Sequence, residues 1–106
     1  MTIPRDLIEL GGASGRRYRF RRVSDLDQLP VSGGNFVYIK HVNGVETVIG
    51  CGASETLHSA KTLWTRAVDE HGADSLYVRL NVSRVQRLVD HDDLSLGQPS
   101  AAGMPI

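Results

Sequence analysis

The fold is decided by residues 35–49, NFVYIKHVNGVETVI. Apolar, aromatic and β-branched residues fill both halves of this stretch, and Asn43-Gly44 divides them. Both residues of that pair tolerate the positive φ that a two-residue type I′ turn requires. The pattern therefore predicts a tight β-hairpin with strands over roughly Asn35–Val42 and Val45–Ile49.

A helix is expected directly after this hairpin. Ser54 is a good N-cap residue, and Glu55 suits the positive end of a helix dipole. Gly72 is placed to end the helix after His71. Apolar residues recur at helical spacing and define one buried face, made of Leu57, Ala60, Leu63, Trp64, Ala67 and Val68.

A third strand and a second helix complete the predicted elements. Residues 76–82 alternate apolar and polar side chains, which is typical of a strand with one apolar face. Ser83 and Gln86 form a capping box that opens the second helix. The side chains that this helix is expected to turn inward are Val85, Leu88 and Val89.

The length of 106 residues indicates one domain with one core. Hairpin, helix, strand and helix in this order predict an α+β fold, a small three-stranded antiparallel sheet flanked by helices. We expect this domain to span residues 16–96. Residues 1–15, which end in a glycine-rich run, are expected to be a flexible arm, and residues 97–106 a loose tail.

The sequence favours a cytoplasmic location without a membrane partner. No apolar run approaches the ~20 residues needed to span a bilayer. Arg5, Asp6 and Glu9 stand where a signal peptide would have an apolar stretch. The single cysteine, Cys51, cannot form an internal disulfide, which agrees with a reducing compartment.

Positive charge is concentrated near the N-terminus although the chain as a whole is neutral. Twelve Lys and Arg balance twelve Asp and Glu, so no global field attracts a polyanion. The local cluster consists of Arg16, Arg17, Arg19, Arg21 and Arg22, interleaved with Tyr18 and Phe20. Such a strip can hold phosphates and stack on bases. The alternative is an edge strand whose arginines keep it soluble and unpaired.

Several short motifs resemble those of the GIY-YIG nuclease domain. They are Leu29-Pro30, Gly34-Asn35-Phe36, Val48-Ile49-Gly50 and Ser54–Leu57. In that family a leucine-proline lead-in precedes a first strand with Gly-Ile-Tyr and a second with Tyr-Ile-Gly. The similarity covers about residues 26–99, and it implies the same α+β element order.

The resemblance also implies which positions would form a nuclease site. The family uses a tyrosine-centred site to activate water, an arginine on the first helix to stabilise the phosphate, and a glutamate on a later helix to hold one divalent metal. A phosphodiester needs such a base, counter-charge and metal. Carried over, the two tyrosines fall on Phe36 and Val48, the arginine on Ala60 and the glutamate near Asp90. Only the acidic position keeps the required chemistry.

A rearranged site is a second possibility. Tyr38 lies two residues beyond Phe36, and His58 and Lys61 lie on the expected first helix. With Asp90 they would supply a hydroxyl, a proton carrier, a cation and a ligand for Mg²⁺ or Mn²⁺. The simpler interpretation makes Tyr38 a half-buried strand aromatic, His58 a solvent-facing helix residue and the acidic run at Asp90 a solvated helix end.

The hairpin register decides on which face any such site would lie. A two-residue turn at Asn43-Gly44 places Phe36 and Val48 on opposite faces of the sheet. A three-residue loop would return them to one face.

The sequence thus leads to three functional expectations. The first is a GIY-YIG-like domain with a degenerate nuclease site that binds DNA or RNA without cutting it, through the arginine cluster with Lys61 and Arg66. The second is a protein-interaction or regulatory module on the same scaffold. The third is a metal-dependent endonuclease with a rearranged site, which would need Mg²⁺ or Mn²⁺.

Overall fold

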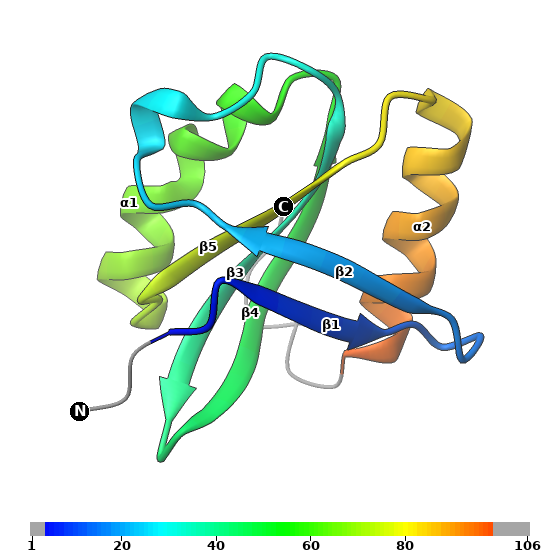
Figure 1. The fold of residues 1–106 in the computed structure, drawn as a ribbon. Helices are drawn as coiled ribbons and strands as arrows, with labels where there is room; N and C mark the ends of the chain where they lie inside the picture. Colours follow the sequence, from blue (N-terminus) through cyan, green and yellow to red (C-terminus); the bar gives the residue numbers. More distant parts are fainter. Residues whose placement is uncertain (1–3, 99–106) are drawn as a thin grey trace.

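The computed structural model describes residues 4–98 and has an α+β architecture, as expected (Figure 1). Five antiparallel strands form one curled sheet in the order β1-β2-β5-β3-β4, so the expectation of three strands is corrected to five. The strands are β1 (Leu7–Gly11), β2 (Arg17–Arg22), β3 (Gly34–Val42), β4 (Val45–Ser54) and β5 (Ser75–Leu80). The helical elements are η1 (Leu26–Gln28), η2 (Leu57–Ser59), α1 (Ala60–His71) and α2 (Arg84–Gly97).

The hairpin of β3 and β4 confirms the predicted turn. Asn43 and Gly44 have φ values of 52° and 79°, as a type I′ turn requires. Pairing continues in one register to Ile39 opposite Val48, then shifts between Tyr38 and Ile39. A β-bulge of this kind bends the strand and increases its twist.

Strand β4 is longer than the sequence indicates, and this moves the start of the helix. Ser54 is the last residue of β4 rather than a helix N-cap. The chain then forms the short turn η2, and α1 begins at Ala60. The expected end of this helix is confirmed, because Gly72 adopts φ 72° and its N–H donates to the Val68 carbonyl at 3.0 Å.

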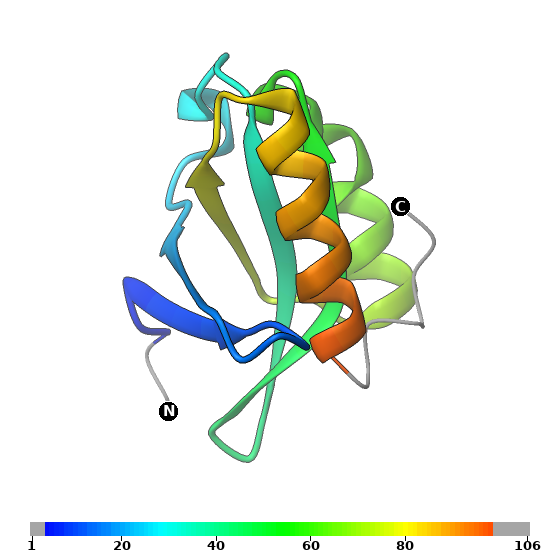
Figure 2. The ribbon, with the colours of Figure 1, turned by 90° about the vertical axis from the view of Figure 1, so that its right-hand side faces the viewer.

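The sheet separates two apolar clusters. Along β3, Phe36 and Tyr38 belong to a cluster with residues of α1, whereas Val37 and Ile39 belong to a cluster with Leu94 of α2. The two helices therefore cover opposite faces, with α2 in front of the sheet and α1 behind it in Figure 2. Side chains of neighbouring β3 residues point to different cores, as strand alternation requires.

The expectation of a flexible N-terminal arm is wrong for residues 7–11. They form β1, which pairs with β2 from Leu7 opposite Arg21 to Gly11 opposite Arg17. Ile8 is only 2% exposed, so the burial of its side chain helps to hold the strand in place. The glycine-rich run is a reverse turn, in which the Gly15 N–H donates to the Gly12 carbonyl at 3.1 Å. Residues 1–3 of the expected arm lie outside the described residues.

Helix α2 begins as predicted but faces the other way. The Ser83 hydroxyl accepts a hydrogen bond from the Gln86 N–H, which confirms the N-cap. However, Val85 is 74% exposed and Val89 53% exposed, and Leu88 is also exposed. The residues that α2 buries are Arg87, Asp90 and Leu94. Of the expected C-terminal tail, residues 97 and 98 end the helix, and residues 99–106 lie outside the described part.

The helices α1 and α2 do not have the properties of membrane-spanning helices. Within residues 4–98, no helix combines the length and the apolar character that crossing a membrane requires.

Candidate nucleic-acid interface

The arginine-rich strand β2 presents two different faces. Tyr18 and Phe20 are buried, at 1% and 0% exposure, whereas Arg17, Arg19 and Arg21 are exposed on the opposite face. The expectation that these aromatics stack on bases is therefore wrong, because their rings lie in the core. The edge-strand alternative is also wrong, since β2 lies between β1 and β5.

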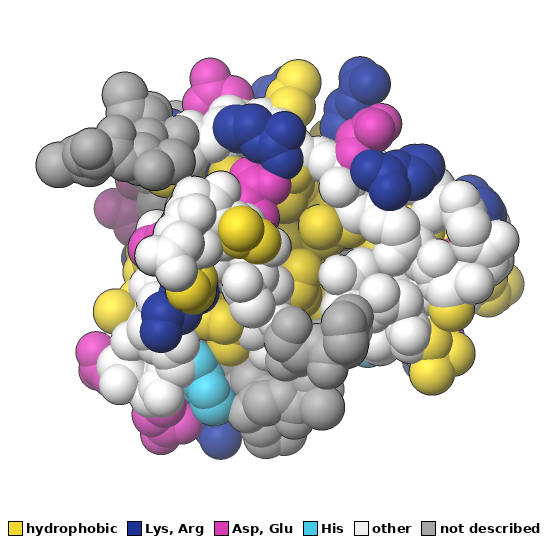
Figure 3. All heavy atoms as spheres, turned by 90° about the horizontal axis from the view of Figure 1, so that it is seen from below, with side chains coloured by type: hydrophobic (Ala, Val, Ile, Leu, Met, Phe, Trp, Pro, Cys, Tyr) yellow, Lys and Arg dark blue, Asp and Glu magenta, His cyan; other side chains and the backbone are white. Residues whose placement is uncertain are grey.

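A basic surface forms where these arginines surround Leu7. We call Arg5, Arg17, Arg19 and Arg21 around the half-exposed Leu7 the arginine face. One hollow of about 340 Å³ is lined by Arg5, Arg17 and Arg19, and a second, of about 310 Å³, by Arg19 and Arg21; Leu7 lines both. Lys and Arg side chains gather along the upper margin of Figure 3, with acidic side chains between them.

The arginine face is only partly neutralised by its own acidic neighbours. Arg5 forms an ion pair with Glu46, and Arg19 lies 3.8 Å from Glu9. Within residues 4–98, neither Arg17 nor Arg21 makes a salt bridge. Surface ion pairs are weak and exchange readily with solvent ions. Two guanidinium groups on this face are thus available to an external anion.

The other arginines of the expected set each lie beside an acidic residue of the chain. Arg16 turns toward α2, with its Nη1 3.4 Å from Asp90 Oδ1, and Arg22 lies 3.5 Å from Asp6. Arg66 lies on α1 and pairs with Glu70 at 2.8 Å. The structure therefore brings together Arg17, Arg19 and Arg21, and Arg22 lines a hollow with Arg21 and Leu7 at the end of β2, whereas Arg16 and Arg66 lie apart.

Asp90, the expected metal ligand, is the centre of a buried polar network. Its carboxylate accepts hydrogen bonds from Gln86 Nε2 at 2.7 Å, Asn81 Nδ2 at 2.8 Å, Arg79 Nη1 at 3.0 Å and Arg16 Nη1 at 3.4 Å. Mg²⁺ and Mn²⁺ prefer several oxygen ligands, whereas all four of these neighbours are donors. The surroundings of Asp90 therefore do not fit a divalent cation. Within residues 4–98, no group of three or more His, Cys, Asp or Glu is placed to hold a metal ion.

Asn35 extends this network to the central strand. Its side-chain oxygen accepts from Asn81 Nδ2 at 3.0 Å, and its Nδ2 donates to the Arg87 carbonyl at 3.1 Å. Arg87 in turn donates from Nη1 to the Val82 carbonyl at 2.8 Å. The network joins β3, β5 and α2, and buried polar groups that are satisfied in this way stabilise one arrangement of the elements. This network was not predicted from the sequence. Its one signal there is the polar amide of Asn35 at the start of an otherwise apolar strand.

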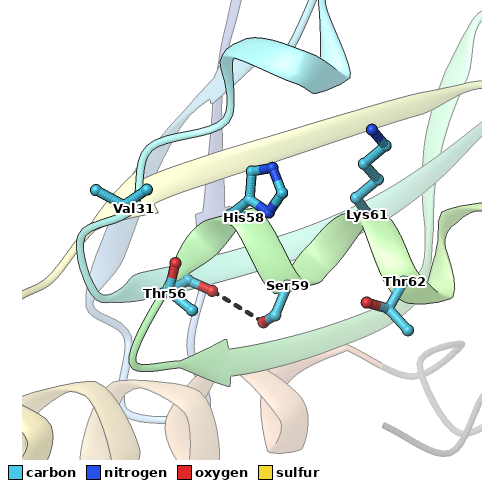
Figure 4. A pocket seen from close by; sticks show the side chains of 6 residues that line it. All are labelled: Val31, Thr56, His58, Ser59, Lys61 and Thr62. Carbon is cyan, nitrogen blue, oxygen red and sulfur yellow. Dashed lines mark hydrogen bonds between the residues drawn. The ribbon is translucent and has the colours of Figure 1, made fainter.

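The proposed catalytic groups do not converge. Tyr38 is fully buried, and its hydroxyl donates to the Ala60 carbonyl at 2.6 Å. Burial raises the pKa of Tyr38, so the hydroxyl stays protonated at neutral pH. His58 of η2 and Lys61 of α1 line an open hollow of about 520 Å³ (Figure 4), and Lys61 Nζ lies 2.6 Å from Asp27. Asp90 belongs to α2, on the other side of the sheet.

The positions matched to the family's tyrosines and arginine are structural here. Phe36 packs in the cluster of α1 and Val48 in that of α2, so the two lie on opposite faces, as the two-residue turn predicts. Ala60 is completely buried, and its carbonyl oxygen accepts the hydrogen bond from the Tyr38 hydroxyl. A guanidinium at this position would have to enter the core, where an unpaired charge is very costly.

A scan against protein-family models, a search of curated proteins and a search of solved structures each found no match to this chain.

Proposed function

We propose that this chain is a nucleic-acid-binding domain that holds phosphates on its arginine face without cleaving the strand. The observation that carries the proposal is the alternation along β2, which turns Tyr18 and Phe20 into the core and Arg17, Arg19 and Arg21 to solvent. Alternate residues of a strand are about 6.6 Å apart, so the three guanidinium groups form a row rather than a point. A row of cations suits a polyanion better than a single small anion.

Recognition on this surface would depend on charge rather than on base sequence. The aromatic rings of β2 are buried, which removes the stacking platform that single-strand binders use. Arginine contacts to phosphates position a nucleic acid but do not read its sequence. We therefore expect similar affinity for unrelated sequences and a strong dependence on salt.

Binding without cleavage agrees with the remaining geometry and with the GIY-YIG resemblance. If the chain has the GIY-YIG scaffold, Phe36, Val48 and Ala60 replace the family's residues that activate water and stabilise the phosphate. Tyr38 has its hydroxyl committed to a backbone carbonyl, and Asp90 is surrounded by donors. The side chains at these positions therefore stabilise the fold and are not free to take part in cleavage.

A salt titration tests the proposal. Binding of a labelled single-stranded oligonucleotide and of a duplex is measured at several salt concentrations, and log K should fall linearly with log salt. Each contacting arginine that is changed to alanine should reduce the slope by about 0.7 for single strands or about 0.9 for duplex. Arg17→Ala and Arg21→Ala should both do so, because neither side chain makes a salt bridge with another residue of the described range 4–98.

The matched control is Arg66→Ala, which removes the same charge from α1, where Arg66 pairs with Glu70. Its salt slope should equal that of the unchanged protein. If Arg17→Ala, Arg21→Ala and Arg66→Ala all reduce the slope equally, binding follows net charge alone and the proposed face is wrong. Absence of binding at low salt would also contradict the proposal.

A further inference from the structure

The outer side of α2 is an apolar surface that no described residue covers. Val85, Val89 and Leu96 are 74%, 53% and 79% exposed, and Leu88 is 48% exposed. Figure 2 looks directly onto this side of the helix. Their spacing places all four on one side of the helix. An amphipathic helix that turns its apolar side to solvent indicates a surface used for association.

The orientation of α2 is fixed by its inner side, so the exposed stripe cannot turn inward. Asp90 is held by its network, and Asp93 accepts hydrogen bonds from the Tyr18 hydroxyl at 2.7 Å and from Ser14. Gly97 lies so close to the turn after β1 that a Cβ there would be 2.6 Å from the Gly11 carbonyl oxygen. Rolling the helix would break all of these contacts and bury charged groups without partners.

We infer that the partner of this surface is a second copy of the chain, with the two α2 helices packed antiparallel across a two-fold axis near Leu88. Two charged residues indicate this partner: Arg84, at the edge of the stripe, and Asp92, which lies within it. Arg84 and Asp92 lie four residues before and four residues after Leu88, in one i, i+4, i+8 row. Both are exposed, and within residues 4–98 neither makes a salt bridge.

Antiparallel packing makes this row complementary to itself. With a two-fold axis at Leu88, Arg84 of one copy lies opposite Asp92 of the other along the paired helices. By symmetry, Asp92 of the first copy lies opposite Arg84 of the second. Parallel packing would instead place Arg84 beside Arg84 and Asp92 beside Asp92. Leu88 would contact its own symmetry mate, with Val85 and Val89 packing alongside.

The charge and size of the chain agree with weak self-association. Lys and Arg balance Asp and Glu at twelve each, so no net charge opposes pairing. A stable interface usually buries about 800 Å² on each partner, and one helix face supplies less than that. We therefore expect a dimer with a dissociation constant in the micromolar range, on the order of 10 to 100 μM.

The test is sedimentation equilibrium of the full chain, without nucleic acid, from about 1 μM to about 500 μM. The unchanged protein should pass from monomer to dimer over this range. Leu88→Lys should keep it monomeric, because it places two like charges at the axis. Leu7→Lys is the matched control: Leu7 is 50% exposed on β1, and its replacement should leave the dimer unchanged.

A charge-exchange cycle tests the pairing itself. Arg84→Glu alone and Asp92→Lys alone should each weaken dimerisation about 5-fold or more, because each brings like charges together twice. The double variant Arg84→Glu with Asp92→Lys should restore it. Both side chains are exposed, and Arg84→Glu places a negative charge in the first turn of α2, which suits the helix dipole.

A protein that stays monomeric over the whole concentration range overturns the inference. The apolar stripe of α2 would then have a different occupant, either the C-terminal residues of the same chain or an unrelated protein. A dimer that the single charge changes do not weaken, or that the double change does not restore, overturns the antiparallel pairing.

Discussion

Helices α1 and α2 cover the two faces of one sheet by opposite means. Helix α1 and the turn before it bury apolar side chains, Leu57, Ala60 and Ala67, against the sheet. Helix α2 buries Arg87 and Asp90 beside a single leucine, Leu94, and leaves its valines in solvent. The first helix is held by the burial of apolar area and the second mainly by directed hydrogen bonds.

The difference shows how a few polar residues can override a hydrophobic pattern. Burying the valines of α2 would remove apolar surface from water and would by itself favour the opposite orientation of the helix. Against it stands the Asp90 network, whose members would lose their partners if the helix rolled. Breaking a buried charged network costs about 3–5 kcal/mol, and Gly97 adds a steric limit. The polar side therefore faces the sheet.

The largest expected effect is on the α2 side. Arg79→Met removes the donor at 3.0 Å from Asp90 and leaves a buried carboxylate with weaker partners. We expect a loss of about 3–5 kcal/mol in the free energy of unfolding, measured by urea denaturation. The double change Arg79→Met with Asp90→Leu should lose less than the single change, because no buried carboxylate then remains and the exposed Arg16 is solvated. A double variant less stable than the single one would show that the hydrogen bonds act independently.

A pair of leucines sharpens the comparison between the helices. Leu57 is completely buried next to α1, whereas Leu96 on α2 is 79% exposed. Leu57→Ala should cost about 3 kcal/mol through lost contacts and a residual cavity. Leu96→Ala should change the free energy of unfolding of the monomer by at most about 0.5 kcal/mol. Similar losses for both variants would mean that α2 packs differently from this structure.

The smallest expected effect is a loss of folding stability at acid pH that depends on Asp93. Hydrogen bonds from Ser14 and Tyr18 hold the pKa of Asp93 below its ordinary value of 3.8. Because the folded-state pKa is the lower one, the unfolded chain binds the proton more readily. The stabilisation is complete above 3.8 and is lost as the pH falls through the lowered pKa. The unchanged protein should thus lose stability below about pH 4 more steeply than Asp93→Asn, in urea denaturation at successive pH values. Parallel curves would exclude this role for Asp93.

The sequence predicted the elements in which local chemistry determines the structure. Asn43-Gly44 specified the hairpin turn, Ser83 the start of α2 and Gly72 the end of α1, and all three are confirmed. Each depends on one residue and its immediate neighbours. The α+β class followed because these signals set the order of the elements.

The rest depends on contacts between distant residues. Strand β1 has only five residues, and its pairing with β2 depends on a turn whose glycines are also typical of a linker. The inward side of α2 depends on Asn35, Arg79 and Asn81, which no helical pattern includes. Of the candidate site residues, the alternating arginines of β2 were predicted as a cluster, but not that their aromatic neighbours face the core.

Asp90 serves as a structural anchor rather than as a metal ligand, and the proposal of binding without cleavage depends on this point. The most direct test measures the free energy of unfolding of the unchanged protein and of Asp90→Asn, each with a chelator and with Mg²⁺ or Mn²⁺. We expect the variant to lose about 3 kcal/mol in the free energy of unfolding, and we expect metal to have no effect on either protein. Stabilisation of the unchanged protein by metal, absent in Asp90→Asn, would contradict it.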